Sequence, residues 1–243
     1  MRTRIFLSLL LFILSAGAWA APFSGPFTLS DGISFYLVNP TGADFDLTVS
    51  HHNAARERRP QPALVRVFDP RDTLVARHEF PGDIVIPAPT EQQDFRIEGG
   101  GQGVYSVIIT GGGQVQIATE PELEFGVYGH FQWLTGNDEQ YADAYVYLPP
   151  GLKQLPIIAD QGFESLTLAD EAGQQMLQLE KGDQNRTVDL PAEGEHVWHM
   201  SARGSGSYRL DFKGYPIIVC PSAQTARAIH AGVDIMADGT ICY

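Results

Sequence analysis

The chain has 243 residues with 16 basic and 29 acidic side chains, which gives a formal net charge of −13 at pH 7. This charge argues against nucleic-acid binding and against an anionic membrane surface, because both carry negative groups that repel the protein. Two cysteines without a C-x-x-C motif do not support thioredoxin-type redox chemistry, and they fall short of the four ligands that zinc prefers.

The first twenty residues have the three parts of a secretory signal peptide. The start "MRTR" is basic, "IFLSLLLFIL" is apolar, and "SAGAWA" ends in a small-x-small pattern. We therefore expect cleavage after Ala20 and a secreted or periplasmic protein with no integral membrane segment afterwards. An uncleaved N-terminal anchor is the alternative. Without Arg2 and Arg4, the mature chain carries 14 basic and 29 acidic residues, a net charge of −15.

Most of the mature chain has the pattern of short antiparallel strands. In residues 63–80, side chains alternate in strand fashion on both sides of the turn "DPRD". Residues 103–121 have the pattern of two short strands around a glycine turn, and residues 165–180 have the pattern of a second hairpin. Residues 222–233 show the periodicity of a helix. They begin with Ser222 as a capping residue and have Gly232 near the end. The sequence predicts an all-β protein with one short C-terminal helix.

Three blocks of sequence recur in the same order. Residues 65–79 match residues 166–180, and Ser34–Gly42 resembles Tyr145–Gly151 with Tyr36 over Tyr147. A third alignment places residues 94–111 over residues 197–214. The repeats predict two tandem antiparallel β-sandwich domains of jelly-roll-like form, spanning residues 21–120 and 121–243. A single large jelly roll is the alternative.

The pattern within each copy resembles a known domain family. "VFDPRDTLVA" with "GVYSVIITG" carries the likeness in the first copy, and "LADEAGQQML" with "GSYRLDFKG" carries it in the second. The pattern resembles the bacterial pre-peptidase C-terminal (PPC) domain over most of residues 23–215, although Glu171 replaces a proline that is usual in that family. The resemblance implies non-catalytic modules that aid secretion or substrate binding, and it transfers no catalytic residue.

The stretch "YADAYVYLPPG" places three tyrosines and one aspartate on one face of a strand. Aromatic rings on a rigid strand stack on the apolar faces of sugars and on other rings. Tyr147 has a counterpart in the first copy and is assigned to packing. The remaining candidates, with two from "VYGHFQWL", are the ligand-binding residues Tyr128, His130, Tyr141, Asp143 and Tyr145. Ordinary strand packing is the alternative interpretation.

Oxygen ligands gather in "TGNDEQYAD", where calcium is a candidate cofactor with Asp138, Glu139 and Asp143 as ligands. The spacing of an EF-hand is absent, and a solvated turn explains the same residues. No other cofactor is expected.

The histidines are predicted to be structural or exposed. The segment "SHHNAARERRPQP", residues 50–62, has the composition of an exposed loop, whose arginines could meet an anionic sugar or an acidic partner. In "EGEHVWHM", the repeat places Trp198 in the core and His199 outside.

Cys220 and Cys242 are predicted to form one disulfide, because an oxidising compartment favours pairing of two cysteines. The bond would tie the last strand region to the C-terminus.

Motifs of hydrolases, metalloproteases and P-loop proteins are absent from the sequence. We therefore expect a non-catalytic binding module whose partner is a polysaccharide or an envelope protein. The alternatives are a structural or accessory protein of the cell envelope and a lyase or hydrolase that acts on polysaccharide.

Overall fold

The computed structural model shows an all-β protein with one short helix, as predicted. No helix among the described residues is long and apolar enough to cross a membrane. The structure describes residues 27–29, 32–53, 60–82, 90–129, 132–134, 142–148, 152–159, 164–180, 182–183, 185–190, 196–203, 207–211, 217–235 and 241–242.

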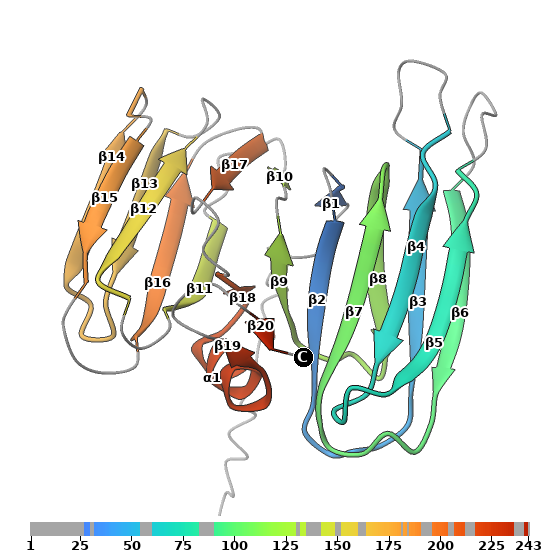
Figure 1. Cartoon of the computed structure of the whole chain (residues 1–243). Coiled ribbons are helices and arrows are strands. Elements are labelled where there is room, and N and C mark those ends of the chain that lie inside the picture. The colour runs from blue at the N-terminus through green and yellow to red at the C-terminus, as the bar shows by residue number, and fades with distance from the viewer. Residues whose placement is uncertain are drawn as a thin grey trace, which may run out of the picture.

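The first half of the chain forms eight antiparallel strands in two facing layers (Figure 1). One layer has the order β5-β4-β7-β2 and the other has the order β1-β8-β3-β6. Alternating apolar residues of both layers meet in the core, where Phe35, Leu47 and Val67 are fully buried. The strands are β1 (Phe27–Thr28), β2 (Gly32–Asn39), β3 (Phe45–His52), β4 (Ala63–Phe68), β5 (Leu74–Phe80), β6 (Thr90–Ile97), β7 (Gly103–Gly111) and β8 (Gln114–Glu120).

The second half repeats this strand order. Its layers have the orders β14-β13-β16-β11 and β10-β17-β12-β15, so each strand of the first half has a counterpart nine numbers later. This arrangement is a tandem of antiparallel β-sandwiches, as predicted, while the boundary near residue 120 stays a prediction. The strands are β10 (Gln132–Leu134), β11 (Ala142–Leu148), β12 (Gln154–Ala159), β13 (Ser165–Ala169), β14 (Gln175–Glu180), β15 (Asn185–Asp189), β16 (His196–Arg203) and β17 (Ser207–Asp211).

One of the three sequence alignments is wrong by one strand. It matched residues 94–111 with residues 197–214 and therefore β7 with β17. In the sheets, β16 lies between β11 and β13 as β7 lies between β2 and β4, so β16 is the counterpart of β7. Alternating apolar strands resemble one another, and a sequence pattern does not distinguish neighbouring strands that share a period of two.

The alignment of residues 65–79 with residues 166–180 agrees with the structure in detail. Both segments form hairpins whose turns begin at an aspartate. Oδ1 of Asp69 accepts hydrogen bonds from the backbone N–H groups of Arg71 and Thr73, both at 2.9 Å. Oδ1 of Asp170 accepts from the same relative positions, at 2.9 and 2.8 Å. The two turns are therefore structural equivalents.

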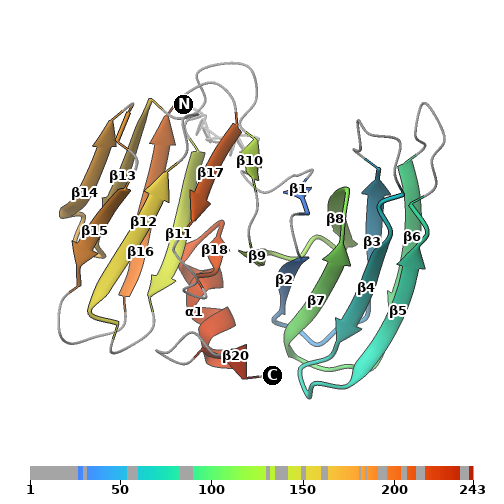
Figure 2. The ribbon, with the colours of Figure 1, turned by 45° about the horizontal axis from the view of Figure 1, so that its top comes forward.

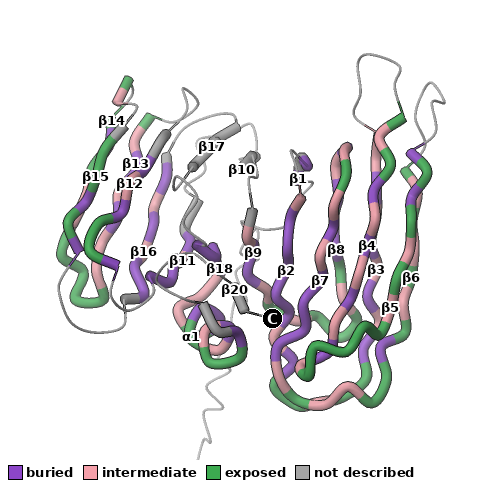
Figure 3. The backbone as a smooth tube through the Cα atoms, in the orientation of Figure 1, coloured by how far each residue is buried: buried purple, intermediate pink, exposed green. Residues whose placement is uncertain are grey.

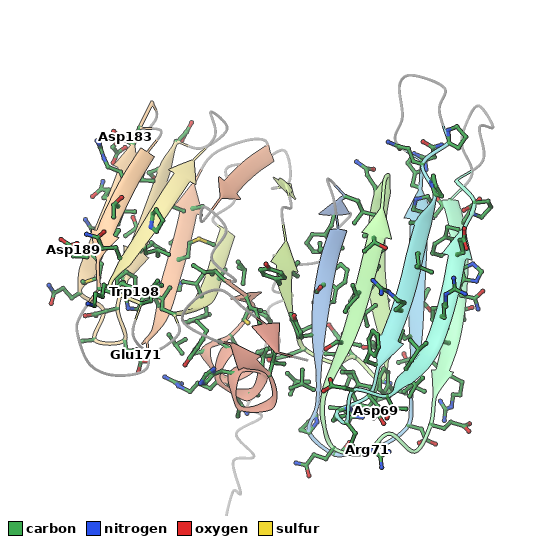
Figure 4. All side chains as sticks on the ribbon, viewed as in Figure 1. Asp69, Arg71, Glu171, Asp183, Asp189 and Trp198 are labelled. Atoms are coloured by element: carbon green, nitrogen blue, oxygen red, sulfur yellow. The ribbon has the colours of Figure 1, made fainter. Side chains whose placement is uncertain are left out.

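The Asp69→Asn substitution is expected to lower the free energy of unfolding by about 1–3 kcal/mol at neutral pH, because Asp69 is buried and its carboxylate holds the turn. Burial alone would raise the pKa of Asp69, but hydrogen bonds from Thr73 and Arg71 and the Arg71 guanidinium, seen beside it in Figure 4, lower it below its ordinary value. The stabilisation is therefore complete above the ordinary carboxyl pKa and is lost as pH falls through the lowered one.

Urea unfolding between about pH 2 and pH 7 measures this effect. The stability difference between wild type and Asp69→Asn should shrink on acidification. Asp170→Asn is the matched control, because the Asp170 side chain is only half-buried. A difference for Asp69→Asn that grows at low pH would contradict the assignment.

The layer β5-β4-β7-β2 of the first sandwich and the layer β14-β13-β16-β11 of the second are joined into one continuous sheet. Strand β9 (Phe125–Gly129) pairs with β2, and β18 (Val219–Cys220) pairs with both β9 and β11. The result is a ten-stranded sheet with the order β14-β13-β16-β11-β18-β9-β2-β7-β4-β5. Figure 2 shows β18 and β9 between the two sandwiches. We call the three strands β11, β18 and β9 the seam. The surface of the ten-stranded sheet that is turned away from the two four-stranded sheets is called its outer face.

Helix α1 (Ala223–Gly232) covers part of the outer face at the seam, and it confirms the predicted helix. Ser222 is its N-cap, as expected, and accepts a hydrogen bond from the backbone N–H of Thr225 at 3.0 Å. Figure 3 shows the buried side of α1 against the largely buried β18. The apolar residues packed there, which we call the seam cluster, are Tyr36, Val104, Tyr147, Val197, Ile218, Cys220, Ala226, Ile229 and Val233.

Carboxylates from both halves hold α1 in place. The Glu124 carboxylate, just before β9, accepts hydrogen bonds from the hydroxyls of Ser222 and Thr225. Glu171, in the turn after β13, forms an ion pair with Arg227 of α1 at 3.1 Å (Figure 4). The helix therefore contacts residues on both sides of the seam. Near the C-terminus, β19 (Asp234–Ile235) and β20 (Ile241–Cys242) form a small separate sheet.

Candidate functional site

The structure brings two of the predicted ligand-binding tyrosines together on the outer face. Tyr128 lies on β9 and Tyr145 lies on β11, on either side of β18. Two strand spacings of about 4.8 Å each therefore separate their strands. Both side chains are half-buried and pack against the border of the seam cluster. Sequence position alone did not predict this proximity, because it depends on β18 pairing between the two strands.

Tyr145 has an aromatic neighbour on the next strand. His199 of β16 lies directly opposite it, and the two ring centroids are 5.1 Å apart with a tilt of 41° between the rings. His199 is half-buried on the outer face and the adjacent Trp198 is buried in the core, as predicted, although the alignment used for that prediction is the one that is wrong by one strand. The outer face therefore presents Tyr145 and His199 as a pair.

Polar residues continue the outer face beyond this pair. Asp143, Ser201, Thr167 and Gln178 occupy directly opposed positions on four neighbouring strands, so they form one row across the sheet. Gln178 accepts a hydrogen bond from the Gln175 side chain at 3.0 Å and donates one to Glu180. Hydroxyl and amide groups beside an aromatic pair are suited to hydrogen bonding with a hydroxyl-rich ligand.

The other predicted ligand-binding residues contribute less to the described site. Tyr141 and His130 lie outside the described residues, and for Asp143 the structure describes the backbone in β11 and not the side chain. Tyr147 is buried beneath α1, where its ring stacks on His230 with centroids 3.9 Å apart. Its counterpart Tyr36 is buried in the same cluster, so the assignment of Tyr147 to packing is confirmed.

The predicted calcium site stays a prediction. Asp138 and Glu139 lie outside the described residues, as does the side chain of Asp143. Within the described part of the chain, no group of three or more histidine, cysteine, aspartate or glutamate residues is placed to hold a metal ion.

The predicted Cys220–Cys242 disulfide is wrong for this structure. Cys220 carries a free thiol that is completely buried. Its Sγ lies in the seam cluster next to Gly126: a Cβ atom added to Gly126 would lie 2.8 Å from this Sγ. Burial raises the pKa of this thiol far above its ordinary value, and the nearby Glu124 carboxylate adds to the shift. The side chain therefore serves as an apolar contact beneath α1.

His51 is a buried polar residue that the sequence interpretation missed. Residues 50–62 were expected to form an exposed loop, but β3 continues to His52 and the His51 side chain is only 1% exposed. Its ring stacks on Phe80, Nε2 lies 2.9 Å from the carbonyl oxygen of Gly112, and Nδ1 lies 3.5 Å from Glu91. The alternation in "FDLTVSH" places His51 on the apolar face and could have indicated its burial.

Comparison with known proteins assigns no family. No protein-family model matches the chain, and no curated protein matches it. Among solved structures, the chain is similar to the N-terminal CBM22-1-CBM22-2 tandem domain from Paenibacillus barcinonensis Xyn10C. The identity is 9% and the TM-score is 0.23, with 82% of this chain and 85% of that chain covered. The functional argument therefore rests on the outer face itself.

Proposed function

We propose that the mature chain is a secreted or periplasmic, non-catalytic module that binds polysaccharide on its outer face. The observation that carries the proposal is the placement of Tyr128 and Tyr145 on the same face of one sheet, on either side of β18. Both rings are held by the seam cluster on regular strands, so little conformational freedom is lost when a ligand binds.

Carbohydrate is the ligand class that matches this surface best. Sugars present apolar ring faces and many hydroxyl groups, and the outer face offers aromatic rings next to Ser201, Thr167 and Gln178. The competing proposals are an envelope-protein partner and an enzyme acting on polysaccharide. The PPC resemblance agrees with a non-catalytic module that accompanies secreted enzymes.

A glycan array with the full mature chain, with and without calcium, tests the proposal. Replacing Tyr128 and Tyr145 together by alanine should weaken the binding of any glycan found on the array roughly tenfold, because each stacked ring contributes about 0.5–1.5 kcal/mol. Isothermal titration calorimetry measures the affinity, and circular dichroism verifies the fold. Loss of binding only when calcium is removed would support the predicted calcium site.

The Tyr145→Phe variant is the matched control, because it keeps the ring and removes only the hydroxyl. It should bind roughly threefold more tightly than Tyr145→Ala, the share of one ring in the expected tenfold loss. Unchanged affinity in a folded Tyr128→Ala/Tyr145→Ala double variant would exclude the seam as the binding site. Capture of an envelope protein without any glycan binding would favour the partner protein, and new reducing ends or unsaturated products would favour an enzyme.

A further inference from the structure

Two arginines face each other on the outer face of the first sandwich. Arg66 of β4 lies directly opposite Arg77 of β5, so two positive charges occupy adjacent positions on neighbouring strands. Like charges directly opposite each other in a sheet are destabilising. This arrangement therefore calls for an explanation other than stability.

Neither arginine has a strong partner among the residues that the structure describes. The Nε of Arg66 is buried without a hydrogen-bond partner among the described residues, and none of the ion pairs found there includes Arg66. The nearest carboxylate contact of Arg77 is with Glu79 at 4.0 Å, and both side chains are more than half exposed. An exposed pair at this distance contributes little. The two guanidinium groups remain available for an external anion.

Four other arginines each have a carboxylate within 3.2 Å, which sets Arg66 and Arg77 apart from them. The closer ion pairs are Arg71–Asp69 at 3.2 Å, Arg96–Asp46 at 3.1 Å, Arg186–Asp183 at 2.6 Å and Arg227–Glu171 at 3.1 Å. In a chain with a net charge of −13, carboxylates are abundant, so two adjacent arginines without a close carboxylate are an exception.

The second sandwich shows that the fold does not need these charges. Thr167 and Gln178 lie 101 residues after Arg66 and Arg77, and they face each other at the same place in the equivalent hairpin. A neutral pair therefore fills this position in one copy and a doubly positive pair fills it in the other.

The arginines are in line with the candidate sugar-binding surface. Successive opposed positions run from Tyr128 through Ser34 and Ile108 to Arg66 and Arg77, in one row across five neighbouring strands. A ligand that stacks on Tyr128 and extends along this row reaches the arginine pair.

Apolar surface adjoins the arginines at the sheet edge. A register shift after Val67 places Phe68 opposite Leu74, and Leu74 and Val75 are 49% and 40% exposed. They are the large apolar side chains most exposed in the described part of the chain. The surface therefore combines cationic groups with apolar patches, which suits a ligand made of sugar rings with acidic substituents.

We propose that Arg66 and Arg77 bind the acidic groups, carboxylate or sulfate ester, of an acidic polysaccharide that crosses the outer face from the seam. The guanidinium group presents paired N–H donors that match the two oxygens of such a group. This inference rests on the proposed function and specifies its ligand class.

The test compares polygalacturonate with its methyl ester, which is the same chain without charge, and dextran sulfate with dextran. The wild-type mature chain should bind at least one acidic polymer more tightly than its neutral counterpart, and salt should weaken that binding. The pair of polymers that shows the preference tells whether carboxylate or sulfate is recognised. Replacing both arginines by glutamine should weaken binding of the acidic polymer roughly tenfold or more. Affinity electrophoresis and calorimetry are the readouts.

The matched control is the Arg96→Gln/Arg186→Gln double variant, which changes the net charge equally on β6 and β15, away from the outer face. It should bind as the wild type does. Equal affinity of the Arg66→Gln/Arg77→Gln variant and the wild type for acidic polymers would overturn the inference, as would an absence of preference for them.

The outcomes separate this inference from the proposed function. Binding to neutral glycans that depends on Tyr128 and Tyr145 but shows no preference for acidic polymers leaves the proposed function standing and refutes the arginine site. Failure of the wild-type chain to bind any acidic or neutral glycan refutes both. Thermal unfolding of the Arg66→Gln/Arg77→Gln variant should occur close to that of the wild type, since removing like-charge repulsion costs no stability.

Discussion

The Trp198→Ala substitution is expected to lower the free energy of unfolding by about 3–5 kcal/mol. Trp198 is the largest fully buried side chain of the protein's described part, and it lies in the apolar core of the second sandwich. Removing the indole leaves a cavity that the rigid strands fill only in part. Equilibrium unfolding in urea, followed by circular dichroism, measures the loss.

The neighbouring residue provides the control. His199→Ala removes a half-buried ring from the outer face, one position further along β16, and should cost about 1 kcal/mol or less. A shift of the register by one residue would exchange the faces of these two side chains. A larger loss for His199→Ala than for Trp198→Ala would therefore contradict the strand pairing described above.

The Gly126→Val substitution is expected to destabilise the protein by about 3 kcal/mol and to loosen α1. Gly126 of β9 lies directly beneath the helix. A Cβ atom there would lie 2.6 Å from Cγ2 of Ile218, 2.7 Å from Cδ1 of Ile229 and 2.8 Å from Sγ of Cys220. All three contacts are too short, so α1 or β18 has to move.

Hydrogen exchange locates this effect. Amides of α1 should lose protection in Gly126→Val, while those of β4 and β7 should keep most of theirs. Gly32→Val is the control, because the nearest atom to a Cβ at Gly32 is the Ile109 carbonyl oxygen at 3.3 Å, at the far end of β2 from the helix contacts. Uniform loss of protection throughout both sandwiches would contradict the prediction that the substitution loosens α1 locally.

Local patterns in the sequence predicted much of the fold. Alternating residues indicated the hairpins at residues 63–80 and 165–180, and the capping residue Ser222 marked the start of the helix. Each of these features depends on neighbours within one element or one turn, and such short-range preferences are carried by the residue types themselves.

Features that depend on distant pairing were not predicted. The short strand β18 inserts between β9 and β11, and nothing in "IIVC" identifies its partners, which lie more than seventy residues earlier in the chain. The proximity of Tyr128 and Tyr145 follows from this pairing, as does the burial of the Cys220 thiol beneath α1. The predicted disulfide was wrong because it was inferred from the compartment and the number of cysteines.

The seam has a consequence for solubility. Without β9 and β18, the backbone N–H and C=O groups along one side of β2 and β11 would be unpaired, and such open edges invite other chains to add as strands. In the intact chain β9 pairs with residues 33–37 of β2, and β18 pairs with Tyr145 and Val146 of β11. The remaining ends of the ten-stranded sheet, β5 and β14, belong to hairpins with irregular register and carry charged or amide side chains. A chain cut at residue 120 would uncover β2 and is expected to self-associate, so aggregation resistance is a property of the joined pair of sandwiches.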